Sequence, residues 1–220
     1  MPGTTPVYGF PYPEPTDLVA DYPALGQDLA EDIEAVLPTL GGYTLISPTS
    51  IANTGGTAST TAGTTTITGV TNVSLNGVFT ATYQNYHLVL NYTGSAAGQI
   101  LARLRVAGAD ASGGNYNTQR AYFYSTTSNP ARFNNETFYR IGSADANVSQ
   151  CLMTTTIASP FLTQATVVLS QEFSNGDSNN TQLGYWGGYH TLSTSYDGIT
   201  VWNNGGTLTG KLRVYGLKGA

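Results

Sequence analysis

The apolar positions of this chain follow two different periods. Leu25, Leu29 and Ile33 recur at a spacing of four, a period that predicts one apolar stripe on an amphipathic helix. Later in the chain the period is two. In residues 86–92 (YHLVLNY), Tyr and Leu alternate with His, Val and Asn, which is typical of a half-buried strand. The pattern therefore predicts a short helix followed by a β domain.

Several further segments read as strands. Residues 100–106 (ILARLRV) alternate in the same way, and the Gly- and Ser-rich residues 93–98 predict a hairpin that joins them to residues 86–92. Residues 163–171, 191–196 and 212–217 are additional strand candidates. The dipeptide Asp197-Gly198 predicts a tight hairpin turn after residues 191–196. Such closely spaced turns predict a mainly β fold, an antiparallel β-sandwich that resembles a jelly roll.

The first residues have a composition of their own. Five prolines lie among Tyr8, Phe10 and Tyr12, and proline at this density favours an extended, polyproline-like strap over a regular helix. Pro23 is favoured at the first helical position and Pro38 cannot continue a helix, so the two residues bracket the amphipathic helix. The sandwich is thus expected to follow an extended Pro/aromatic strap and one short helix.

Charge divides the chain at about the same place. Residues 1–40 contain seven acidic residues and neither Lys nor Arg, whereas all eight basic residues lie further along. Residues 47–66 consist almost wholly of Ser, Thr, Gly, Ala and Asn, a composition typical of a flexible linker. We therefore expect residues 1–46 to form an attachment and oligomerisation segment, residues 47–66 a linker, and residues 67–220 the β-sandwich.

Overall composition excludes several classes of protein. The formal net charge of −5 provides no basic field for a phosphate backbone, so we expect no nucleic-acid partner. No apolar run approaches the roughly 20 residues that cross a bilayer, so we expect no membrane insertion. The N-terminal residues lack the basic and apolar regions of a Sec signal peptide, and Cys151, the single cysteine, cannot form an intrachain disulfide.

The sequence contains few residues in patterns typical of catalytic sites. His87 lies within a predicted strand and His190 within the run GYWGGYH, and neither belongs to a nucleophile, zinc or phosphate-binding motif. A glycosidase needs two facing carboxyl groups, and most acids of the β domain adjoin turn residues. We therefore expect no catalytic residues, no cofactor and no metal, and keep a host-polysaccharide-cleaving enzyme as an alternative.

Aromatic residues suggest two kinds of contact. The set Tyr116, Tyr185, Trp186, Tyr189 and His190 combines rings with bare glycine backbone, which suits the apolar face of a sugar; the competing interpretation places these rings in the core. A second set is expected to contact neighbouring subunits, and comprises Tyr8, Phe10, Tyr12, Leu25, Leu29 and Ile33. The helix stripe has two possible partners, the chain's own β domain or copies of itself.

Two stretches carry a resemblance to a known class of proteins. Residues 15–19 (PTDLV) and 22–24 (YPA) resemble the N-terminal module of tail-associated structural proteins from tailed phages of actinobacteria. Residues 71–79, 83–90, 101–106, 107–117 and 210–217 resemble the β domains of phage fibre and minor tail proteins. These motifs are packing and turn residues, and they contain no active site.

The resemblance implies a virion structural protein. Our leading hypothesis is a non-enzymatic minor tail or small tail-fibre component, with the host surface glycan as a candidate contact. The resemblance also implies a homotrimer that binds other virion proteins and is made in the host cytoplasm before it joins the exterior of the tail or capsid. A capsid-attached head fibre or decoration protein is the main alternative.

Overall fold

The structure is a computed structural model that describes residues 3–4, 9–14, 22–36, 42–146, 150–175 and 181–217. The chain divides into two compact units, residues 1–42 and residues 43–219. Strands hold most of the described residues, in antiparallel sheets, which confirms the predicted mainly β, sandwich-like fold with one helix in the described part of the chain.

The N-terminal unit contains the predicted helix. In this unit α1 (Tyr22–Val36) lies against β2 (Pro11–Tyr12), which pairs antiparallel with β1 (Gly3–Thr4). The helix begins beside Pro23 as predicted. Leu25 is buried within this unit, whereas Ile33 on the same stripe is 37% exposed.

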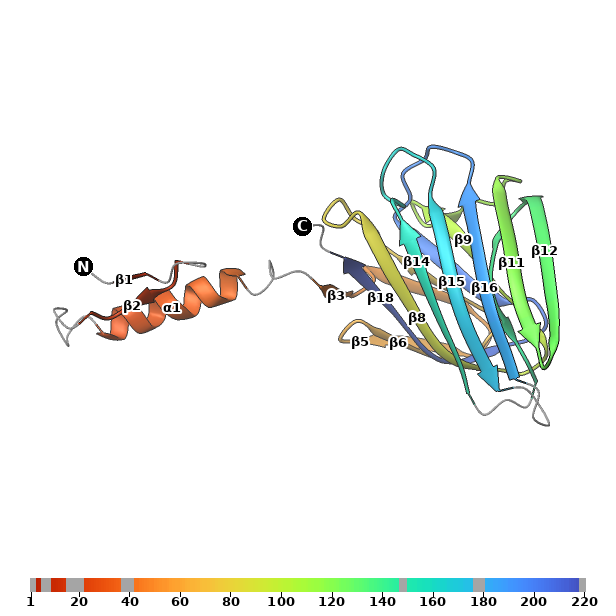
Figure 1. Ribbon diagram of the computed structural model, residues 1–220, viewed down its shortest axis with the longest axis horizontal. Coiled ribbons are helices and arrows are strands. Elements are labelled where there is room, and N and C mark those ends of the chain that lie inside the picture. The colour runs from red at the N-terminus through yellow and green to blue at the C-terminus, as the bar shows by residue number, and fades with distance from the viewer. Residues whose placement is uncertain are drawn as a thin grey trace. The chain divides into compact units, whose positions relative to one another are not determined.

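The larger sheet of the second unit has ten strands (Figure 1). In spatial order they are β12 (Thr127–Glu136), β11 (Tyr116–Tyr124), β16 (Thr181–His190), β15 (Val167–Asn175), β14 (Cys151–Ala158), β8 (Asn85–Gly94), β18 (Leu208–Leu217), β6 (Thr64–Val70) and β5 (Thr57–Thr61), with β3 (Tyr43–Ile46) also paired to β18.

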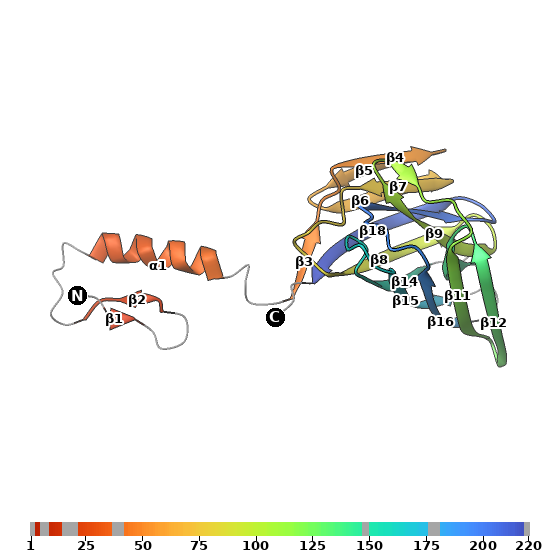
Figure 2. The same ribbon diagram turned by 90° about the horizontal axis from the view of Figure 1, so that it is seen from above.

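The smaller sheet faces it as a second layer, which Figure 2 shows from above. Its strands are β10 (Ala109–Asp110), β9 (Gly98–Val106), β17 (Gly198–Asn203), β7 (Asn72–Asn76) and β4 (Ser50–Thr54), with β13 (Tyr139–Ala144) paired to β9. All the pairings in both sheets are antiparallel.

The hydrophobic core lies between the two sheets. The alternation predicted for residues 86–92 is confirmed, because Tyr86, Leu88, Leu90 and Tyr92 of β8 are all buried and the residues between them are not. From the other sheet, Ile100, Ala102 and Leu104 of β9 join the same cluster. The period of two thus gives each sheet one face for the core.

Residues 47–66 do not form the expected linker. They contain β4, β5 and the start of β6, so the sandwich unit begins at Tyr43 rather than at residue 67. The physical reason is that Thr is β-branched and favours extended backbone, so a Thr-rich stretch differs from a Gly/Ser-rich one. Gly55 and Gly56 supply the positive φ values of 68° and 50° that turn β4 into β5.

Both predicted hairpins are also wrong. β8 and β9 do not pair with each other: β8 pairs with β14 and β18 in the larger sheet, whereas β9 pairs with β10, β13 and β17 in the smaller one. Residues 93–98 therefore carry the chain from one layer to the other. Residues 191–196 form no strand, and β17 after Asp197 pairs with β7 and β9 instead.

Of the remaining strand candidates, residues 212–217 lie within β18 as predicted. The candidate at residues 163–171 is partly correct, because β15 begins only at Val167.

We expect Leu90→Ala to lower the free energy of unfolding of the sandwich by about 3 kcal/mol, because it leaves a cavity in a fully buried layer. The neighbouring Val89 is half-buried and points away from the core, so Val89→Ala should cost less than about 1 kcal/mol. Urea denaturation of the full chain measures both values. Equal costs for the two variants would contradict the assigned faces of β8.

Candidate functional site

The register of β16 sorts its aromatic residues onto two faces. β16 is paired on one side with β11 and on the other with β15 over nearly its whole length. Tyr185 and Tyr189 point outward and are 45% and 48% exposed, whereas Trp186 points inward and is 1% exposed. The period of two along a strand fixes this division.

Three of the five residues predicted to contact a glycan are therefore core residues. Tyr116, Trp186 and His190 are buried between the sheets. The Tyr116 ring contacts the rings of His190 and Tyr139 edge-on, with centroids 4.5 Å and 4.7 Å apart. Burial lowers the pKa of His190, whose Nδ1 lies 3.1 Å from the Tyr196 hydroxyl. The core interpretation holds for these three, and a surface site can use only Tyr185 and Tyr189.

A shallow groove of about 370 Å³ lies on the outer face next to Tyr189. Most of the exposed surface of its wall is apolar, with the amide, hydroxyl and guanidinium groups of five residues set into it; its lining comprises Asn117, Thr118, Gln119, Arg132, Asn134, Val167, Gly187, Gly188 and Tyr189. One aromatic ring beside several amides offers stacking together with hydrogen bonds, the combination that a sugar ring requires.

The two glycines of the groove have different roles. A Cβ on Gly188 would lie 2.5 Å from the carbonyl oxygen of Asn117, so close packing requires glycine there. A Cβ on Gly187 would meet only Leu169, at an ordinary 3.8 Å. The fold does not need glycine at residue 187, and the missing side chain leaves the groove open.

The predicted assembly residues lie in the N-terminal unit. Leu25 is buried there and Leu29 and Phe10 are half-buried, whereas Tyr12 and Ile33 are exposed. Tyr8 lies outside the described residues. Contact of this set with neighbouring subunits remains a prediction.

A buried acid that the sequence analysis did not single out lies between the sheets. Glu172 of β15 points inward, where the backbone N–H and the hydroxyl of Ser143 both donate to its carboxylate. Burial raises the pKa of Glu172 to about 7, and the two bonds from Ser143 and the nearby Trp186 indole and Arg120 guanidinium limit the rise. The indole N–H of Trp186 has no hydrogen-bond partner of good geometry.

Space for this carboxylate comes from two glycines. A Cβ on Gly142 or Gly184 would lie 2.8 Å or 2.5 Å from its oxygens. Because the strand predicted from the sequence ended at residue 171, no local signal in the sequence announced this site.

Another pocket, of about 340 Å³, lies close to Glu172, beside Ser143 and Gln182. Its polar lining includes Gln99, Arg120, Ser143, Asp145 and Gln182. Glu172 does not line it, because Ser143 and Gln182 stand in between, joined by a hydrogen bond of 2.8 Å. Asp145 is therefore the carboxylate that this pocket presents. The hydrogen bonds of Ser143 to Glu172 and Gln182 join β13 to β15 and β16. They do not place two carboxyl groups opposite each other across a cleft, as a glycosidase requires.

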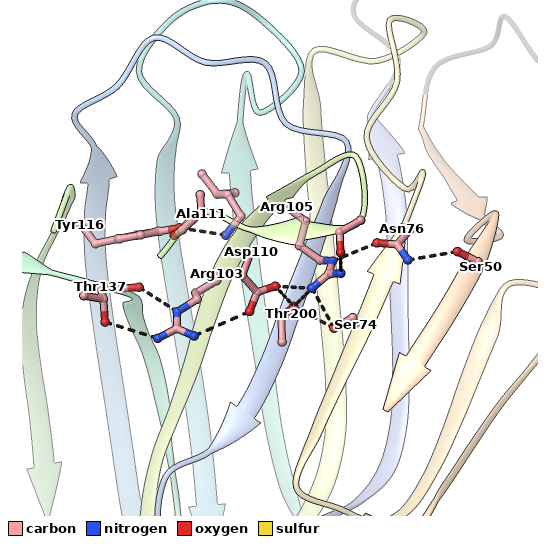
Figure 3. Close-up of polar contacts among 12 residues, drawn as sticks. Ser50, Ser74, Asn76, Arg103, Arg105, Asp110, Ala111, Tyr116, Thr137 and Thr200 are labelled. Carbon is pink, nitrogen blue, oxygen red and sulfur yellow. Dashed lines mark hydrogen bonds and ion pairs between the residues drawn. The ribbon is translucent and has the colours of Figure 1, made fainter. Parts of the chain in front are cut away.

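The outer face of the smaller sheet carries a polar network around Arg105 (Figure 3). The Arg105 guanidinium donates to Asn76 Oδ1 at 2.9 Å and to Thr200 Oγ1 at 2.8 Å, and forms an ion pair with Asp110. Arg103 donates to the carbonyl of Thr137 at 2.9 Å and lies 3.7 Å from Asp110. These groups satisfy one another across β7, β9, β10 and β17, so the network serves to hold the sheet together.

Within the described residues, no group of three or more His, Cys, Asp and Glu side chains is arranged to hold a metal ion. Over the same residues, α1 lacks the length and hydropathy that a membrane-crossing helix needs.

Comparisons with known proteins do not assign the chain to a family. No family model and no curated protein matches it. Among solved structures, it shows a likeness to a protein of unknown function, SO2946, from Shewanella oneidensis MR-1. The identity is 10% over 80% of this chain and 79% of the other, with a TM-score of 0.26. At that score the likeness adds nothing to the description of the fold or the site.

We expect the stability of the sandwich to fall as pH rises from about 4.5 to about 7, because the folded protein keeps a proton on Glu172 that the unfolded chain has lost. The contribution of this group is full below pH 4.5 and is lost above pH 7, by at most about 3 kcal/mol. Glu172→Gln removes the ionisation, so it should flatten the decline and stabilise the protein above pH 7.

Denaturant unfolding of the full chain across that pH range measures the effect. Glu34→Gln, an exposed acid on α1, is the matched control and should leave the pH dependence unchanged. A Glu172→Gln profile that follows the wild-type slope would show that the carboxylate is not the titrating group.

Proposed function

We propose that this chain is a non-enzymatic structural protein of a phage virion, a minor tail or small tail-fibre component. The residues that resemble phage tail proteins support the proposal, as does the division into a small N-terminal unit and a large β-sandwich. In this proposal the N-terminal unit attaches the protein to other virion proteins and to identical chains, as a homotrimer. The chain is made in the host cytoplasm and works on the exterior of the particle.

The observation that best supports a role in binding a host glycan is the groove beside Tyr189. It is open, it lies on a sheet face, and its lining combines one exposed ring with Asn117, Gln119 and Asn134. We propose that this groove takes a sugar unit of the host surface glycan. The ring of Tyr189 would stack on the sugar, and the amides would meet its hydroxyl groups.

The lining of the groove favours binding over cleavage. Hydrolysis of a glycosidic bond generally uses two carboxyl groups that flank the bond, and the lining of this groove contains neither Asp nor Glu. The polysaccharide-cleaving alternative would therefore need another site, and the pocket beside Gln182 presents Asp145 with Glu172 set behind it.

Labelling of particles tests the virion proposal. Antibodies raised against the full chain, followed by gold labelling and electron microscopy of the phage that encodes it, should mark the tail or its tip. Label on the capsid would support the head-fibre or decoration alternative instead. Particles without label, from lysates in which the protein is present, would refute a virion role.

Substitutions in the groove test the glycan proposal. We expect Gly187→Val to fill the groove without strain in the sheet, because a Cβ there has ordinary contacts only. Both Gly187→Val and Tyr189→Ala should weaken binding of the full chain to isolated host cell-wall polysaccharide at least tenfold, or about 1.4 kcal/mol.

Tyr43→Ala is the matched control. It removes a 61% exposed ring on β3, which does not line the groove, and the variant should bind as the wild type does. Retention of binding by both groove variants would place the glycan elsewhere. Binding by none of the proteins, the wild type included, would remove the glycan from the proposed function.

A further inference from the structure

The polarity of β15 is reversed relative to an ordinary solvent-facing strand. Its inward positions after Val168 are Ser170, Glu172 and Ser174, whereas its outward positions include Leu169 and Phe173. Leu169 is 55% exposed and Phe173 is 49% exposed. A sheet with one face in water normally alternates apolar-in and polar-out. The outward face of β15 therefore has the composition of a sheet face that packs against another surface.

The inward polar residues of β15 have a structural explanation. The Ser170 hydroxyl donates to the carbonyl of Ile141 at 2.5 Å, and the hydroxyl of Ser143 donates to Glu172 at 2.7 Å. Both partners lie on β13, so these bonds join the two sheets. They account for Ser170 and Glu172, whereas the buried Ser174 hydroxyl has no hydrogen-bond partner among the described residues, and they leave the apolar exterior unexplained.

The exposed apolar residues continue across four neighbouring strands. Phe173 lies opposite Leu152 of β14 on one side and Leu183 of β16 on the other, and Leu183 lies opposite Phe123 of β11. With Tyr185 and Leu169 on the same face, they form one contiguous surface. We call it the apolar band, and its members are Leu152, Leu169, Phe173, Leu183, Tyr185 and Phe123, each 41–55% exposed.

The size of the apolar band matches a part of a protein interface. Six large side chains, each almost half exposed, present roughly 500 Å² of apolar surface. The Thr, Gln and Ala residues between them extend the face toward the ~800 Å² that one partner contributes to a standard interface. A scattering of single exposed residues would not give such a continuous area.

The charges around the band indicate the kind of partner. The outward side chains described on β11, β14, β15 and β16 are all uncharged. Charge on this face begins at Arg132 of β12 on one side and at Lys211 and Arg213 of β18 on the other. A second copy presents the same neutral apolar surface, so two copies meet there without burying an ionised group.

We propose that the apolar band is an interface between identical copies of this chain. The inference goes beyond the assembly role proposed for the N-terminal unit, because it places a self-association surface on the sandwich itself. The band is centred on Phe173 and Leu183, whereas the groove lies beside Val167 and Tyr189 further along the same two strands; Leu169, opposite Gly187, marks where the two surfaces meet.

The mass of the full chain in solution tests this proposal. Light scattering should give at least twice the 23.1 kDa of a single chain for the wild type. The double variant Phe173→Thr with Leu183→Thr places β-branched residues, which favour strands, at two outward positions, so it should fold, and its self-association should weaken at least 100-fold.

The double variant Leu162→Thr with Leu192→Thr is the control, because these residues are 40% and 46% exposed outside the band. It should keep the wild-type mass. A wild type that is monomeric at every concentration, or a band variant that keeps the wild-type mass, would overturn the proposal. The second result would show that contacts elsewhere hold the copies together.

A labelling experiment gives an answer that does not depend on the band variant folding. Cys151 is buried and its pKa is raised to about 12, so a cysteine in place of Gln171, at the outward centre of the band, is the reactive thiol. Its reaction with a maleimide should slow as protein concentration rises.

Thr61→Cys, on an exposed position of β5 away from the band, is the matched control and should react at a constant rate. Concentration-independent labelling at both positions would overturn the proposal. Neither experiment uses a glycan or a virion, so the inference can fail while the proposed function stands, and the reverse.

Discussion

The register of β16 between β11 and β15 is the constraint on which the groove and the apolar band depend. A slip of one residue would turn Tyr185 and Tyr189 into the core and expose Trp186 and His190. Several contacts oppose such a slip. Trp186 and His190 fill the interior, and Gly184 and Gly188 leave room for the Glu172 carboxylate and the Asn117 backbone. The packing of the inner face thereby determines which side chains the outer face presents.

The larger sheet has two chemically different faces, and the face that carries the apolar side chains differs from strand to strand. At β8 the inner face is aromatic and aliphatic and makes the usual sandwich core. At β15 the inner face makes hydrogen bonds to β13, and the apolar side chains other than that of Val168 point outward. Buried polar groups are stable only when they are paired, and Ser170 and Glu172 meet that condition. The outward apolar residues have no comparable partner within the described part of the chain.

Local periodicity predicted local structure well and long-range pairing poorly. The alternation of residues 86–92 identified the buried face of β8, and the spacing of Leu25, Leu29 and Ile33 identified α1. The predicted hairpins were wrong because Gly- and Ser-rich residues mark a change of direction without specifying the strand that comes next to it. The linker was wrong because a Thr-rich composition was read as flexible. Glu172 and the apolar band were invisible to periodicity, since they depend on which strands are neighbours.

The position of β18 has a consequence for how the protein is made. The strand with the last described residues lies in the interior of the larger sheet, between β8 on one side and β6 and β3 on the other. Until the ribosome has synthesised it, β8 and β6 each have an open edge, and the core has no continuous wall. The sandwich therefore cannot complete its folding before β18 has left the ribosome. A chain that stops before residue 208 lacks a central strand, so a prematurely terminated product cannot form a complete sandwich.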